Sequence, residues 1–381
     1  MIKYCFILLL LFPLVVQCQT KSDGIGDLVR VNYTNIDTSD VEVNAVVKVW
    51  TSYLKSRIYG WILKNDTLGF NAWNNEERES YPRPDFVFSI FPALFFFHTA
   101  VLNIEPVDHN YYRILNCNSV ADSTGNVQIK AIYYVLAGKT EGEYKLFNYF
   151  YHEKEKLKTT DVGKVQYYYP GYYPFSNEKA RKFVEFQDSL SILFNQPVIH
   201  KLTYIFDTNT VSLMNRIGFI YQPMLPGAHD GRYITDDYLL LSASDENHRH
   251  ELVHYFTSLE NPDHILLFDE GLATCLGGNK GHDLKWHANN LYQYFIHEMH
   301  SDTSKIMGLD SMSKITDPLY VKGAIIMKYA IDKYGFQKAL TLLSYPENKY
   351  TPEDVIAKEL GIPRLQLNSF LLEYMKKYAG L

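Results

Sequence analysis

The chain has 381 residues, which is too long for one ordinary hydrophobic core and predicts two domains plus a targeting segment. Hydrophobic residues make up 46% of the chain and charged residues 21%, a composition that is typical of globular proteins and argues against disorder. The net charge is −6 and the sequence has no basic cluster, which argues against nucleic acid as a partner.

Residues 1–18 have the pattern of a secretory signal peptide. The apolar run from Phe6 to Val16 follows a short basic start and is too short to span a membrane as a mature helix. Cleavage after Cys18 would release a secreted or periplasmic protein. A second interpretation stays open, in which Cys18 is the acylated cysteine of a lipoprotein at the cell surface. Lipid attachment at Cys18 would then be the only contact with a membrane.

Residues 19–38 are polar and are expected to form a linker. Ser39 begins a capping-box pattern, and apolar residues follow it at helical spacing. This pattern predicts a helix from Ser39 to about Arg57.

The segment that follows predicts a curved antiparallel sheet. The apolar run 86–104 is expected to hold two buried strands, because Pro92 and His98 interrupt it and make a membrane span a poorer interpretation. Turn residues then separate three further strands, which we expect at residues 111–116, 127–137 and 144–152. A long helix followed by such a sheet resembles the cystatin-like or nuclear-transport-factor-2-like cone fold. We therefore expect residues 39–172 to form an N-terminal α+β module.

A stretch rich in tyrosine, proline and glycine suggests a domain boundary after residue 172. Residues 173–381 are expected to form a second α+β domain that ends in a bundle of helices. Its predicted elements before the motif described next are a helix capped by Ser176 that ends at about Phe194, a strand at Leu202–Phe206, a short helix from Thr208, and a strand at Tyr238–Leu241.

The motif H-E-x-x-H occupies residues 250–254. On a helix, positions i and i+4 lie on one face, so His250 and His254 can bind one Zn²⁺ together. Glu251 would lie beside the metal without binding it, where it can act as a general base. Ser244 or Asp245 is expected to cap this helix.

A catalytic zinc site needs a third protein ligand and an open fourth position. Glu270 is the candidate, sixteen positions after His254. We expect Asp269 to cap a second helix and to place Glu270 in its first turn. Gly271 and Ala273 are small enough to let two helices approach closely around a metal.

A second sequence imitates the motif further along the chain. It reads His297-Glu298-Met299-His300, with the histidines three positions apart, and no third ligand with a similar context follows it. We interpret it as the polar face of a helix.

The motif at 250–254, followed by the E-G-x-A sequence at 270–273, resembles the gluzincin metallopeptidases of the thermolysin and aminopeptidase N type, a peptidase MA-like group. The resemblance covers about residues 176–381 and implies a zincin-like domain. It also implies that His250, His254 and Glu270 bind the zinc and that Glu251 is the general base and acid.

A further resemblance lies downstream, where Tyr320-Val321-Lys322-Gly323 is similar to the Y-x-K-G sequence of aminopeptidase N-like enzymes. It implies that Tyr320 donates a hydrogen bond to the oxyanion of the reaction. The G-x-M-E-N sequence that binds a substrate's amino terminus in those enzymes is missing. Whether the protein is an aminopeptidase or an endopeptidase therefore stays open.

These observations predict an exported zinc-dependent peptidase that acts on a peptide or protein. The strand at Tyr238–Leu241 is expected to offer its edge to an extended peptide. An alternative stays open: a non-catalytic secreted binding or surface-assembly protein with a structural zinc site. Such sites usually have four protein ligands, often cysteines, and Cys275 lies shortly after Glu270.

Overall fold

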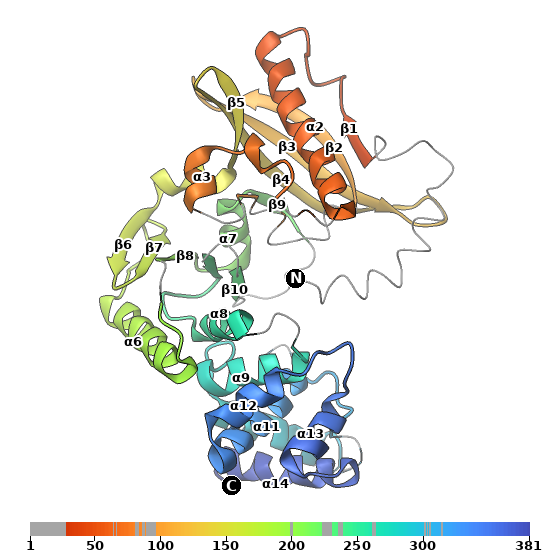
Figure 1. The fold of residues 1–381 in the computed structure, drawn as a ribbon, viewed down its shortest axis with the longest axis vertical. Helices are drawn as coiled ribbons and strands as arrows, with labels where there is room; N and C mark the ends of the chain where they lie inside the picture. Colours follow the sequence, from red (N-terminus) through yellow and green to blue (C-terminus); the bar gives the residue numbers. More distant parts are fainter. Residues whose placement is uncertain are drawn as a thin grey trace.

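Two β-sheets and a C-terminal helical region make up the mixed α/β structure of the protein (Figure 1). The predicted mixture of helices and strands is thus confirmed. The computed structural model describes residues 28–63, 65, 67–80, 84–85, 88, 97–198, 201–222, 231–234, 239–260, 264–300, 302, 304, 306–313 and 315–381. The expected signal peptide and Cys18 lie outside these residues. Within the described part of the chain, no helix is long and apolar enough to cross a membrane.

The first sheet is the antiparallel meander expected in the N-terminal half, with a parallel strand β1 added at one edge. The strand β1 uses residues that were expected to form a linker. A late strand, β9, pairs with β4. The strands are β1 (Val29–Val31), β2 (His98–Pro106), β3 (Tyr111–Ala121), β4 (Val127–Thr140), β5 (Glu143–Asn148) and β9 (Phe219–Tyr221).

Two of the strands predicted for this region differ from the structure or lie mostly outside its described part. The strand predicted at 144–152 ends at Asn148, and the short helix α5 (Tyr149–Glu153) follows it. Of the two strands predicted between residues 86 and 104, the second is β2, and the first falls almost wholly on residues outside the described part of the chain.

The long helix α2 (Val41–Ile62) packs on this sheet, where its buried Trp50 donates a hydrogen bond to the Asn116 side chain of β3 at 2.7 Å. Its cap differs from the prediction. The carboxylate of Asp40, not Ser39, accepts hydrogen bonds from the backbone N–H groups of Glu42 and Val43. Asp40 is the better cap because its carboxylate is charged and lies at the positive end of the helix dipole.

The second sheet has the order β10-β11-β8-β7-β6. Its central strands are parallel and its outer strands antiparallel. The strands are β6 (Lys158–Val162), β7 (Val165–Tyr169), β8 (Leu202–Phe206), β10 (Gly231–Ile234) and β11 (Leu239–Ser242).

The strand β11 does not offer a free edge, which corrects the expectation for residues 238–241. It lies between β8 and β10, so β10 is the edge strand on this side. Leu240 faces the core of the C-terminal half, whereas Leu239 and Leu241 face the core under the first sheet. A strand buried on both faces explains the uninterrupted apolar sequence.

The two sheets exchange strands across residue 172, where the boundary was expected. The strands β6 and β7 precede this residue yet pair into the second sheet. The strand β9 follows it yet pairs into the first sheet. The division of the chain into two domains therefore stays a prediction.

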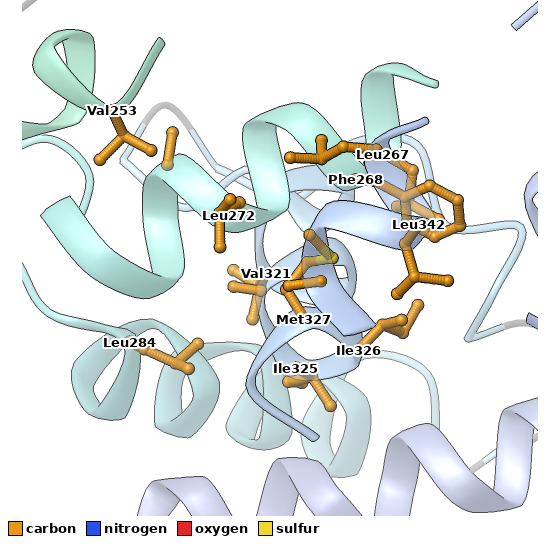
Figure 2. Packing of buried hydrophobic residues seen from close by; sticks show 14 of the residues in the cluster. Val253, Leu267, Phe268, Leu272, Leu284, Val321, Ile325, Ile326, Met327 and Leu342 are labelled. Atoms are coloured by element: carbon orange, nitrogen blue, oxygen red, sulfur yellow. The ribbon is translucent and has the colours of Figure 1, made fainter. Parts of the chain in front are cut away.

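Helices cover the second sheet and form the C-terminal region, and Figure 2 shows their buried side chains meeting in one core. Helix α6 (Asn177–Phe194) begins after Ser176, whose side chain accepts from the backbone N–H of Lys179, as predicted. The remaining helices are α3 (Asn75–Ser80), α6 (Asn177–Phe194), α7 (Thr210–Arg216), α8 (Arg249–Glu260), α9 (Leu266–Gly277), α10 (Leu284–His297), α11 (Pro318–Tyr334), α12 (Phe336–Leu343), α13 (Pro352–Leu360) and α14 (Leu367–Ala379).

The helices α9 and α11 cross with their backbones in contact. A Cβ atom added to Gly323 would lie 2.0 Å from the carbonyl oxygen of Leu267, and one added to Gly271 would lie 2.4 Å from the Gly323 carbonyl carbon. Only hydrogen fits at either position. The crossing therefore sets the distance between Glu270 on α9 and Tyr320 on α11.

Replacing Gly323 with alanine should force these two helices apart. We expect Gly323→Ala to lower the free energy of unfolding by roughly 1–3 kcal/mol, the usual cost of overpacking. Gly171→Ala is a matched control, because the nearest atom to an added Cβ there is 3.9 Å away. Thermal and urea denaturation of both variants test this, and equal stability of Gly323→Ala and the wild type would contradict it.

Candidate metal centre

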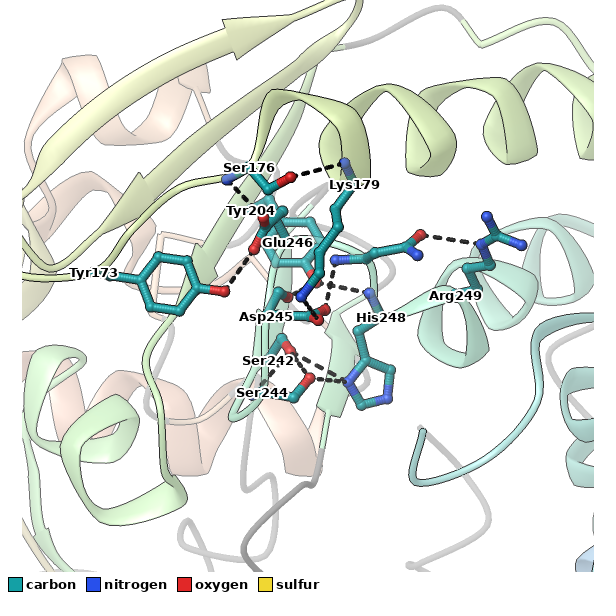
Figure 3. Close-up of polar contacts among 11 residues, drawn as sticks. Tyr173, Ser176, Lys179, Tyr204, Ser242, Ser244, Asp245, Glu246, His248 and Arg249 are labelled. Atoms are coloured by element: carbon teal, nitrogen blue, oxygen red, sulfur yellow. Dashed lines mark hydrogen bonds and ion pairs between the residues drawn. The ribbon is translucent and has the colours of Figure 1, made fainter. Parts of the chain in front are cut away.

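The turn that leads from β11 into α8 is held by a buried tyrosine (Figure 3). The hydroxyl of Tyr204 donates to the carbonyl of Asp245 at 2.6 Å and accepts from the backbone N–H of His248 at 3.0 Å. Since Tyr204 is fully buried, these two bonds are shielded from competing water. They determine where the helix with the H-E-x-x-H motif begins.

A buried carboxylate fixes the same turn from its other side. Glu246 accepts from the hydroxyl of Tyr173 and from the backbone N–H of Ser176, each at 2.7 Å, as Figure 3 shows. The turn is thereby tied to the start of α6. Hydrogen bonds to a charged acceptor are stronger than neutral ones, so this contact gives the turn a firm anchor.

The predicted caps of α8 lie in the turn and not at the start of the helix. The helix begins at Arg249, and the carboxylate of Asp245 accepts from the backbone N–H of Asn247. The hydroxyl of Ser244 lies 3.4 Å from Nδ1 of His248. Both side chains stabilise the approach to the helix, so the expectation that one of them caps it was wrong.

The two helices α8 and α9 bring three ligand atoms together. They are Nε2 of His250, Nε2 of His254 and Oε2 of Glu270. The two nitrogens are 3.3 Å apart, and the oxygen lies 3.1 Å from the first and 3.4 Å from the second. His250 is buried and the other two side chains are nearly so. Among the described residues, these three form the one group of this kind.

The size of this triangle fits a tetrahedral metal ion. Bonds of roughly 2.0–2.1 Å from a tetrahedral ion place neighbouring ligand atoms roughly 3.3–3.4 Å apart. The observed separations of 3.1–3.4 Å match this value. The spacing of the group therefore suits a bound metal ion, and with no fourth His, Cys, Asp or Glu ligand among the described residues, one corner of the tetrahedron is left to a non-protein group.

The other ring nitrogens of the histidines point to acceptors. Nδ1 of His250 lies 2.8 Å from the carbonyl of Gly278, and Nδ1 of His254 lies 3.3 Å from the carboxylate of Asp269. An acceptor at Nδ1 holds the proton there and leaves the lone pair of Nε2 for a metal. A neutral ring with such a partner is in the tautomer that ligation requires.

Asp269 has a different place from the one predicted. Helix α9 begins at Leu266 without a side-chain cap, so Asp269 lies within the helix and Glu270 follows its first turn. The carboxylate of Asp269 instead accepts from the hydroxyl of Thr257 at 2.9 Å while it contacts His254. It orients a ligand, which the sequence did not reveal.

The site is arranged to hold positive charge. Burial would raise the pKa of Glu270, but the charge of His254 and hydrogen bonds from both histidines hold it at about 2. Burial would lower the pKa of His254, but the carboxylates of Asp269 and Glu270 raise it well above its ordinary value of 6.5. Without a metal, a proton on His254 supplies part of this positive charge.

Tyr320 lies against the ligands, since its ring stacks on that of His250 with centroids 5.8 Å apart and planes inclined by 8°. Burial, followed by the charges of Glu270 and Glu251, raises the pKa of its hydroxyl well above 10. Tyr320 is therefore a neutral hydrogen-bond donor at neutral pH. Four of the five predicted site residues thus lie in contact, and the fifth, Glu251, follows His250 on α8 and acts on Tyr320 through its charge.

No protein-family model matches this chain, and no curated protein matches it in sequence.

Zinc binding should release protons near neutral pH. His254 keeps its proton above pH 6.5 because its pKa is raised, and a metal must displace that proton. Affinity should consequently rise with pH through neutrality. Calorimetric titration in buffers of different ionisation enthalpy measures the protons released per zinc, and a value of zero near neutral pH would contradict this account.

Asp269→Asn provides the companion experiment. It removes the main charge that raises the pKa of His254, so fewer protons should be released. It also replaces the charged acceptor at Nδ1 with a neutral amide, and weakening such a partner lowers metal affinity by roughly 10–100-fold. Unchanged affinity and proton release in this variant would show that Asp269 does not orient the ligand.

Proposed function

We propose that the protein is a zinc-dependent peptidase of the gluzincin type, which hydrolyses peptide bonds in a peptide or protein substrate. The observation that carries the proposal is the triangle of His250, His254 and Glu270, which fits tetrahedral Zn²⁺ and leaves one position for a non-protein group. Two histidines and a carboxylate with an open position are typical of catalytic zinc, whereas structural zinc usually has four protein ligands.

Zn²⁺ bound there would supply a Lewis acid that polarises the scissile carbonyl and makes water acidic enough to lose a proton near neutral pH. Glu251 accepts that proton and then gives it to the leaving amine. Its carboxylate suits this task because it follows the first ligand on α8 and is not itself one of the three ligands.

Tyr320 donates its hydroxyl proton in a hydrogen bond to the oxyanion that forms on the former carbonyl oxygen. The raised pKa of Tyr320 keeps it a donor throughout. Its contact with His250 and the tight crossing of α9 and α11 hold it in place beforehand. A donor that is already oriented stabilises the transition state without the cost of reorganisation.

The structural-zinc alternative receives no support from Cys275. This cysteine lies on α9 but does not belong to the group of side chains that could hold a metal ion. The charged groups that act on its thiol are Lys328 and Asp332 of α11. Burial raises the pKa of the thiol to about 12, which disfavours the thiolate that a metal needs.

The test compares Glu251→Gln with the wild type on a peptide library, with products identified by mass spectrometry. We expect the variant to bind one zinc per chain and to lose roughly 10²–10⁴-fold in cleavage rate, the usual contribution of acid–base catalysis. Glu298→Gln is the matched control, since it makes the same change in the imitating sequence at the end of α10. Equal cleavage by Glu251→Gln and the wild type would overturn the proposal.

Tyr320→Phe separates the role of the hydroxyl from that of the ring. The variant keeps the ring that stacks on His250, so zinc affinity should stay unchanged. The turnover rate should fall roughly 10²–10³-fold, as for loss of one oxyanion donor. Zinc titration and steady-state kinetics together test this, and an unchanged turnover rate would exclude Tyr320 as the donor.

A further inference from the structure

His287 is a buried histidine of α10 that contacts none of the three ligands but joins two segments next to them. Its Nε2 lies 2.8 Å from the carbonyl of Asn279, and its Nδ1 lies 3.1 Å from the hydroxyl of Thr316. Because a carbonyl only accepts, the neutral ring carries its proton on Nε2 and accepts from Thr316 on Nδ1. The side chain is 1% exposed, so water does not replace either bond.

The first segment is the turn that presents an acceptor to the ligand His250. The backbone groups of Asn279 and His282 bond to each other, each at 2.9 Å, around a two-residue turn. The Asn279 carbonyl thus accepts from both His282 and His287. Immediately before it, Gly278 has a φ of +77°, and its carbonyl accepts from Nδ1 of His250. A displaced Asn279 would turn this carbonyl away from the ligand.

The second segment is the start of the helix that carries Tyr320. The hydroxyl of Thr316 is fully buried and also accepts from the side-chain amide of Asn290 at 3.2 Å. The next residue, Asp317, caps α11 by accepting from the backbone N–H of Leu319 at 2.9 Å. Tyr320 lies in the first turn of this helix, so the position of Thr316 determines where the ring of Tyr320 lies.

We propose that His287 is a positioning residue of the metal centre, which holds the acceptor of His250 with one ring nitrogen and the start of the Tyr320 helix with the other. The inference rests on the proposed zinc site. The ring is rigid, so it also sets the distance between the two segments. Trp286 packs edge-on against it, with centroids 5.0 Å apart and planes at 90°, and limits its rotation.

Two substitutions separate the two contacts. A glutamine amide can replace Nε2 and donate to Asn279 but cannot also accept from Thr316 in the same geometry. An asparagine amide is shorter and can replace only Nδ1, toward Thr316. His287→Asn should therefore disturb the ligand, whereas His287→Gln should disturb Tyr320.

The experiment measures zinc affinity by competition with a chelator, the visible spectrum of the cobalt-substituted protein, and steady-state kinetics. His287→Asn should bind zinc roughly tenfold more weakly, the low end of the loss seen when a ligand's supporting contacts are removed, and should show an altered cobalt spectrum. His287→Gln should keep the zinc affinity and the cobalt spectrum of the wild type. Its kcat should fall with little change in KM.

His264→Asn is the control for a purely structural effect. His264 is also buried, and its Nδ1 contacts the carbonyl of Leu343, which is neither a ligand nor the acceptor of one. This variant should lower the melting temperature without changing the zinc affinity or the cobalt spectrum.

Two results would overturn the inference while the proposed function stands. One is wild-type zinc affinity and cobalt spectrum in His287→Asn, and the other is the same loss of zinc affinity in both substitutions and in the His264→Asn control. If the wild type binds no zinc, or binds it as well after His250→Ala, the proposed function fails and the inference fails with it.

Discussion

Three hydrogen-bond acceptors converge in the C-terminal half of this protein, and the rest of the site is arranged around them. The Nε2 atoms of His250 and His254 and a carboxylate oxygen of Glu270 lie within 3.4 Å of one another. With both Nδ1 atoms facing acceptors, neutral rings turn their lone pairs to the centre, and these lone pairs repel one another unless a cation lies between them. Such an arrangement is stable with a metal ion bound and is otherwise relieved only by a proton.

Holding these atoms in place requires rigid supports, and the fold supplies them at three points. The buried Tyr204 fixes the turn before α8. The contact of Gly271 with Gly323 fixes the crossing of α9 and α11, because a methyl group at either position would separate the helices. His287 links the Gly278 turn to the start of α11. The three metal-binding atoms and the ring of Tyr320 are thus held in a fixed arrangement, as the proposed catalytic role requires.

Local spacing predicted that His250 and His254 lie together, because helical periodicity places both on one face of α8. The errors arose where several residues could meet the same local requirement. Asp40 caps α2 in place of its neighbour Ser39, and Asp269 orients a ligand where a helix cap was expected. Spacing also predicted the strand β11. It did not predict β10, which pairs with β11 and covers the edge of that strand. The link through His287 joins residues far apart in the sequence, and no local pattern indicates such a contact.

The most direct measurement is a crystal structure of the zinc-loaded protein, with anomalous scattering recorded at the zinc absorption edge. We expect one strong peak bonded to Nε2 of both histidines and to the carboxylate of Glu270, with a non-protein group in the fourth position. A zinc peak elsewhere in the protein would contradict the proposed metal centre. So would a fourth protein ligand at this site, such as the thiol of Cys275.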